Sequence, residues 1–218
     1  STLMRSSAAS DVYKRQAVAE KRGLILRLGE RVFEIVCRFI VQHDIHAMGI
    51  EYIECNLSVV QCAYDHLAQD FIAIMEKYHV DANDIVLEIT ESASITEKKI
   101  LLDNMNALRK VGVRFALDDF GTGFSNLHCI VNMNPNYVKL DNHFTAKAMS
   151  QTRDFELLKK IVELVHSIDI KICIEGVEKE EWYQKLKEIH ADYLQGYLFG
   201  RPCDKNQFLN QFICKGIN

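Results

Sequence analysis

The chain has 218 residues, of which 48% are hydrophobic and 26% are charged. This length suits one domain with a substantial hydrophobic core, and the composition excludes a disordered or fibrous protein. The net charge of −4 excludes a general basic surface that would hold long nucleic acid. No stretch approaches the roughly 18 apolar residues of a membrane span. The 7 cysteines are odd in number and form no C-x-x-C pair, which favours a cytoplasmic location.

The first sixteen residues are small and polar, without helical or strand periodicity. We expect residues 1–16 to be a non-native leader or a linker from an upstream domain. The folded domain is therefore predicted to span residues 17–218, and an upstream region of the full-length protein could tether it to a membrane.

From residue 30 onward, short runs rich in Ile, Val, Tyr and Phe alternate with longer stretches that have apolar residues at helical spacing. Such alternation predicts parallel strands joined by right-handed crossovers, as in a TIM-like (β/α) barrel or an open doubly wound sheet. The predicted strands are residues 50–56, 84–88, 113–118, 136–139, 170–175 and 192–195. The predicted helices are residues 29–44, 63–79, 96–112, 153–168, 180–190 and 205–213.

The ends of the predicted strands favour the barrel. Each strand ends in or is followed by a polar side chain, and in a barrel the carboxyl ends of all strands converge on one face, where such enzymes place their chemistry. Capping of the following helix could explain any single one of these residues. It does not explain a lysine or two adjacent aspartates. The strand-end residues are Asn56, Glu88, Asp118 with Asp119, Lys139, Glu175 and Gln195.

Four carboxylates and an amide around one mouth would repel each other unless cations lay among them. All-oxygen ligands select hard ions such as Mg²⁺ or Mn²⁺ over zinc. Adjacent aspartates suggest a carboxylate shared by two ions, as in sites that transfer phosphoryl groups. The glycines after Asp119 do not have the spacing of an ATP P-loop or a dinucleotide-binding loop. The residues therefore predict a two-metal phosphoesterase.

Several segments together resemble the EAL domain, the bacterial cyclic di-GMP phosphodiesterase. "CNLSVVQ" is similar to its N-L-S-x-x-Q segment, "VLEITES" to E-L-T-E-S, "LDDFGTGFSNL" to D-D-F-G-T-G-Y-S-S-L, and "VKLD" to L-K-I-D. "IEGVE" is similar to A-E-G-V-E, and "QGYLFGRP" to Q-G-Y-L-F-S-R-P. The matches run in order from about Ala17 to the C-terminus, and several in order are more specific than any one alone.

The resemblance implies a modified TIM barrel that uses two Mg²⁺ or Mn²⁺ ions to hydrolyse cyclic di-GMP to linear pGpG in second-messenger signalling. Asn56, Glu88 and Asp118 would hold one ion, and Asp118, Asp119 and Glu175 the other. Lys139 would position or deprotonate the attacking water, Gln195 would donate or accept a hydrogen bond nearby, and Glu175 is an alternative base.

The resemblance also implies that Glu91 and Glu178 support the glycine loop near a homodimer interface, and that the full gene could carry a sensory or GGDEF domain upstream. The Glu-Ala-Leu segment that names the family is predicted to be absent, and with it the first strand of the barrel, one carboxylate ligand and a phosphate-binding arginine. The alternatives are a cyclic di-GMP receptor or dimerising scaffold without turnover, and a different two-metal phosphodiesterase on a similar barrel.

Overall fold

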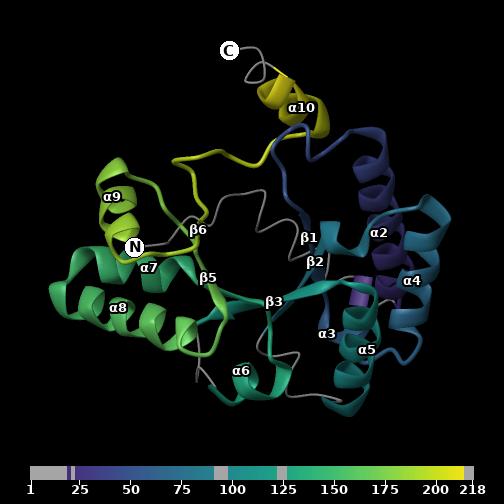
Figure 1. Cartoon of the computed structure of the whole chain (residues 1–218), viewed down its shortest axis with the longest axis horizontal. Coiled ribbons are helices and arrows are strands. Elements are labelled where there is room, and N and C mark those ends of the chain that lie inside the picture. Colours follow the sequence, from purple (N-terminus) through teal and green to yellow (C-terminus); the bar gives the residue numbers. More distant parts are fainter. Residues whose placement is uncertain (1–18, 21–22, 91–97, 122–126, 214–218) are drawn as a thin grey trace. The chain divides into compact units, whose positions relative to one another are not determined.

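The computed structural model describes residues 19–20, 23–90, 98–121 and 127–213 (Figure 1). The chain divides into two compact units. The first comprises Ser1–His43 and Tyr52–Val113, and the second comprises Asp44–Glu51 and Arg114–Asn218. In the described part of the chain, no helix combines the length and the apolar character needed to cross a bilayer.

The first unit is a pair of parallel strands covered by helices. Strand β1 (Ile53–Leu57) pairs with β2 (Ile85–Thr90) in a register that runs from Ile53 opposite Ile85 to Leu57 opposite Ile89. Figure 1 shows helices α2, α4 and α5, coloured purple to teal, side by side next to these strands, and α4 contacts both α2 and α5. The helices of this unit are α2 (Ile25–Gln42), α3 (Val59–Cys62), α4 (Leu67–Tyr78), the 3-10 turn η1 (Ala82–Asp84) and α5 (Lys98–Val111).

The core of the first unit lies between these helices and the strands. The rings of Phe33 on α2 and Phe71 on α4 stack with centroids 4.0 Å apart, and both side chains are fully buried. Strand β2 is buried along almost its whole length, as expected for a parallel strand with both faces covered.

The second unit contains four parallel strands in chain order. Strand β3 (Arg114–Phe120) pairs with β4 (Tyr137–Leu140), β4 with β5 (Lys171–Ile174), and β5 with β6 (Tyr193–Leu194). Parallel pairing requires a crossover between successive strands, and helices supply it here. These helices are α6 (Leu127–Met133), α7 (Asn142–Ser150), α8 (Thr152–His166) and α9 (Glu180–Glu188), and α10 (Lys205–Ile213) follows the last strand.

All six predicted strands are present, with bounds that differ by one to three residues. The predicted helix at 205–213 coincides with α10, whereas the one at 63–79 is shorter in the structure, where α4 begins at Leu67 and ends at Tyr78. Helices α6 and α7 are not among the predicted helices. Helix α7 has a local signal, since the side chain of Asp141 accepts a hydrogen bond from the His143 amide at 2.8 Å and so caps the helix.

Candidate functional site

In the first unit, Asn56 and Glu88 are direct neighbours across the strand pair. Their Cα atoms are register partners on β1 and β2, and both lie near the carboxyl ends of their strands. Asn56 is exposed, whereas Glu88 is only 4% exposed. Adjacent parallel strands are about 4.8 Å apart, so an amide oxygen and a carboxylate are available within reach of one cation.

The chain leaves β1 in a fixed direction. Ser58 and Gln61 form a capping box in which the Ser58 hydroxyl accepts from the Gln61 amide and the Gln61 side-chain oxygen accepts from the Ser58 amide, both at 3.1 Å. The polar residues of the "NLSVVQ" segment therefore have two different roles, one in ligand binding and one in capping the helix. Asn56 is available as a ligand, while Ser58 and Gln61 hold the turn that follows it.

In the second unit, a bulge in β3 displaces the paired aspartates from the regular ladder. Leu117 is the partner of Val138 and Phe120 is the partner of Leu140, so Asp118 and Asp119 together lie opposite one residue. Asp119 has φ of 58°, in the left-handed region that aspartate tolerates better than most residues. A bulge re-aims side chains next to active sites, and here it frees two consecutive carboxylates from strict strand alternation.

Lys139 lies opposite this bulge on β4 and forms an ion pair with Glu175. The Lys139 ammonium is 2.9 Å from Glu175 Oε1, with the lysine side chain 4% exposed and that of the glutamate 20% exposed. A buried lysine needs a carboxylate partner, because the desolvation of an unpaired ammonium costs several kcal/mol. The structure thus brings together two residues that the sequence analysis had assigned to proton transfer and to metal binding.

Gln195 is exposed and follows β6, where its backbone joins the loop after β5. The backbone N–H of Gln195 donates a hydrogen bond to the Ile174 carbonyl at 3.0 Å, and the backbone N–H of Val177 donates one to the backbone carbonyl of Gln195 at 3.0 Å. The two loops approach so closely that a Cβ on Gly196 would clash with the backbone of Val177. The "EGVE" and "QGYLFG" segments are therefore one packed pair of loops.

The remaining predicted residues are less informative. Glu178 is exposed, in the loop after Glu175. Glu91, the glycine loop at 122–126 and the predicted leader at 1–16 lie outside the described residues, so these predictions stay untested. Among the residues that the structure describes, no three His, Cys, Asp or Glu side chains form a group that could hold a metal ion. The candidate ligands lie two in the first unit and three in the second, and the hard oxygen donors of each set suit Mg²⁺ or Mn²⁺.

Asp141, which is not among the predicted site residues, is buried at 8% exposure directly after β4. Its side chain caps α7, and its backbone amide donates to the Phe120 carbonyl at 3.2 Å, across the end of the bulged strand. The signal for this residue was present, because an aspartate before a helical stretch is a common N-cap.

These features define a parallel α/β protein with polar and charged residues at the carboxyl ends of its strands, as in barrel enzymes. The EAL domain family matches residues 14–202. The chain belongs to the EAL domain family.

Proteins with similar sequences include the cyclic di-GMP phosphodiesterase RocR of Pseudomonas aeruginosa, 33% identical over 74% of this chain and 41% of RocR. The oxygen sensor protein DosP of Escherichia coli is 30% identical over 85% of this chain and 23% of DosP. The chain thus spans less than half the length of these curated relatives.

Solved structures with the same fold include the PaMucR phosphodiesterase in complex with c-di-GMP, which has a TM-score of 0.80 and 30% identity, covering 88% of this chain and 78% of that one. The EAL enzyme Bd1971 bound to cAMP and cyclic di-GMP has a TM-score of 0.81 and 25% identity, covering 90% of this chain and 54% of that one. The predicted fold class, an α/β fold of the TIM-like kind found in EAL structures, is confirmed.

One prediction is corrected by these matches. The predicted absence of the EAL segment is wrong, because the EAL domain is present over residues 14–202. The expectations that depended on this absence, a missing ligand and a missing phosphate-binding arginine, are therefore not carried further.

Proposed function

We propose that this chain is a metal-dependent phosphodiesterase that hydrolyses cyclic di-GMP to linear pGpG in bacterial second-messenger signalling. The observation that carries the proposal is the pairing of buried Lys139 with Glu175 beside the bulge that holds Asp118 and Asp119. Support also comes from relatives such as RocR, which is named a cyclic di-GMP phosphodiesterase.

Asn56 and Glu88 of the first unit, with Asp118, would hold one Mg²⁺ or Mn²⁺ ion. Asp118, Asp119 and Glu175 would hold a second. When bound, such ions neutralise the phosphate and lower the pKa of a coordinated water. These assignments follow the family resemblance and the oxygen chemistry of the side chains.

The chain's own residues supply the remaining steps. Lys139, held in place by Glu175, orients the attacking water through its ammonium, and the proton of that water goes to the Glu175 carboxylate, or to Lys139 when its amine is neutral. The exposed amide of Gln195 is free to hydrogen-bond to the substrate or the water. The Lys139 side chain is almost fully buried, so water has little access to its ammonium except from the site.

The experiment is hydrolysis of cyclic di-GMP with Mg²⁺ or Mn²⁺, followed by chromatography of pGpG. The unaltered chain should release pGpG, EDTA should abolish the reaction, and Asp118→Ala should lower the rate at least 100-fold. Glu156→Gln, which removes an exposed carboxylate on α8, is the matched control and should keep the rate within twofold. Saturable binding of cyclic di-GMP without pGpG would instead identify a receptor, and turnover of other phosphodiesters in preference would identify a different enzyme.

We further propose a homodimer and a sensory or GGDEF partner domain in the full-length protein. Sedimentation of the chain with and without cyclic di-GMP tests the first, and a monomer under both conditions at 50 to 100 μM, a range chosen for the assay, would refute it.

A further inference from the structure

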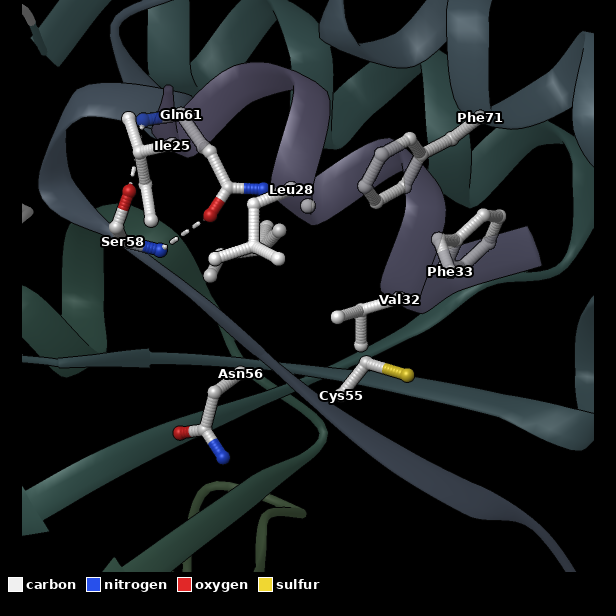
Figure 2. Close-up of a pocket in the computed structure, with 11 residues that line it drawn as sticks. Ile25, Leu28, Val32, Phe33, Cys55, Asn56, Ser58, Gln61 and Phe71 are labelled. Carbon is white, nitrogen blue, oxygen red and sulfur yellow. Dashed lines mark hydrogen bonds between the residues drawn. The ribbon is translucent and has the colours of Figure 1, made fainter. Parts of the chain in front are cut away.

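The first unit contains a cavity of about 290 Å³ between helix α2 and strand β1 (Figure 2). Its volume lies at the lower end of the range of ligand pockets, about 300–1,000 Å³. Leu28 and Val32, each nearly half exposed, form its rim. The cavity is lined by Ile25, Leu28, Gly29, Val32, Phe33, Cys55, Asn56, Leu57, Ser58, Gln61 and Phe71.

One polar side chain projects into this apolar space. Gln61 is only 4% exposed, and its side-chain oxygen accepts a hydrogen bond from the Ser58 amide. Among the described residues, its Nε2 group has no hydrogen-bond partner. Figure 2 shows the oxygen of this amide directed at Ser58 and the nitrogen directed toward α2, on the side of Leu28. This nitrogen is not among the described side-chain atoms that are both fully buried and unpaired, so it meets the space of the cavity, where a ligand with an acceptor gains a hydrogen bond.

The helix facing Gln61 leaves space for its amide. A Cβ at Gly29 would clash with Gln61 Nε2, so glycine at this turn of α2 is what allows the amide to extend between helix and strand. The polar group is therefore held on both sides, by the capping box with Ser58 and by close packing on Gly29. A donor fixed in this way discriminates between ligands better than a mobile surface amide.

The lining also determines the charge and shape of a ligand. It contains no charged side chain, so an ion would lose its hydration without a counter-charge. The stacked rings of Phe33 and Phe71 form one wall, which suits an alkyl chain or a flat ring. Asn56 lines the cavity as well, but Figure 2 shows its amide directed away from α2, which leaves Gln61 as the amide that faces the apolar walls.

We propose that this cavity binds a small neutral molecule with an apolar chain or ring and one carbonyl oxygen, which accepts a hydrogen bond from Gln61 Nε2. The site lies within the first unit and needs neither a metal ion nor cyclic di-GMP. Binding of such a molecule and hydrolysis of a phosphodiester are separate properties, so either one stands if the other fails.

The test uses three probes of equal chain length: 2-octanone, octane and sodium octanoate. Titrations are followed by ¹³C-methyl NMR of Leu28 and Val32 in the full chain. We expect saturable shifts with 2-octanone, binding of octane weaker by about fivefold or more because it lacks the acceptor, and no saturation with octanoate. Gln61→Met keeps the side-chain volume without the donor and should bind 2-octanone and octane equally.

Two variants outside the hydrogen bond make the result independent of the capping box. Val32→Trp fills the cavity and should abolish binding of 2-octanone. Val41→Trp changes a residue on the same helix that is 56% exposed and outside the lining, and it should leave binding unchanged.

Three results would overturn the proposal. The first is a folded chain whose Leu28 and Val32 methyls do not respond saturably to 2-octanone. The second is undiminished binding by Val32→Trp. The third is a set of nuclear Overhauser contacts in the probe-free protein between both methyl groups and residues that do not line the cavity. Such contacts would mean that the chain itself or a second copy fills the cavity.

Discussion

The ion pair between Lys139 and Glu175 makes a quantitative prediction about stability. Two unit charges 2.9 Å apart attract with about 6 kcal/mol at an effective dielectric constant of about 20, but desolvation of both groups offsets most of this. We expect a net coupling of about 2 kcal/mol between the two side chains. Glu175→Gln should lower the free energy of unfolding by about 3 kcal/mol or more, because it withdraws a counter-charge from the more deeply buried partner. Lys139→Met should lower it by less.

The assay is urea unfolding at pH 7 without divalent ions, followed by far-ultraviolet circular dichroism, for both single variants and the double variant. The matched control is the exposed pair of Lys160 and Glu163 on α8, whose atoms are 2.7 Å apart but whose side chains are 70% and 63% exposed. Its coupling should be about 0.5 kcal/mol or less. If the free-energy changes at 139 and 175 add to within about 0.5 kcal/mol, the reasoning from burial is refuted.

The same cycle bears on the proposed metal site. If Glu175 is a ligand, a saturating concentration of Mg²⁺ or Mn²⁺ competes with Lys139 for its carboxylate. The coupling between the two side chains should then fall below its metal-free value. Coupling that does not change at a metal concentration supporting hydrolysis would remove Glu175 from the ligand set.

Three further changes test the geometry around the site. Gly196→Ala places a Cβ against the Val177 backbone and should lower the free energy of unfolding by about 2 kcal/mol in thermal unfolding. In the control Gly200→Ala, the new Cβ meets nothing within 4 Å, and the free energy of unfolding should change by no more than about 0.5 kcal/mol. Equal effects would contradict the close approach of the loops. Asp119→Gly should be about 1 kcal/mol more stable than Asp119→Ala, because its φ of 58° suits glycine, and the reverse order would exclude this backbone conformation. Burial raises the pKa of the Cys37, Cys55 and Cys62 thiols to about 12, so at pH 8 only about one in ten thousand of each is thiolate. In a Cys129→Ser, Cys173→Ser, Cys203→Ser, Cys214→Ser variant, which keeps these three thiols alone, modification by a disulfide reagent should therefore be slow, and rapid reaction of the folded protein would contradict it.

The parallel α/β fold could be predicted from hydrophobic periodicity, because each strand is a short apolar run and most of the long helices have a strong amphipathic pattern. Helix α6 is seven residues long and its sequence, "LHCIVNM", has the composition of a short strand, so local propensity could not identify it. Helix α7 is held by the Asp141 cap and by packing on α8, and the second of these is a tertiary contact that the sequence does not display.

The site residues were found from their position at strand ends, but their geometry was not. Two adjacent aspartates do not predict a β-bulge, since a bulge depends on the register of the partner strand. The register partner of Lys139 is Cys173, so the ion pair with Glu175 runs to a residue two positions further along the chain. Distances of this kind depend on twist and side-chain direction, which a list of strand ends does not contain.

The loops that follow β5 and β6 are joined by amides and carbonyls at Val177, Gln195 and Leu198, with Gly196 providing the room. Main-chain hydrogen bonds are indifferent to the identity of the side chains they connect. The main chain of the two loops thus sets the spacing between Glu175 and Gln195. Anyone who transplants substrate contacts between EAL domains should accordingly move both loops together, as a single cassette, and keep the glycine.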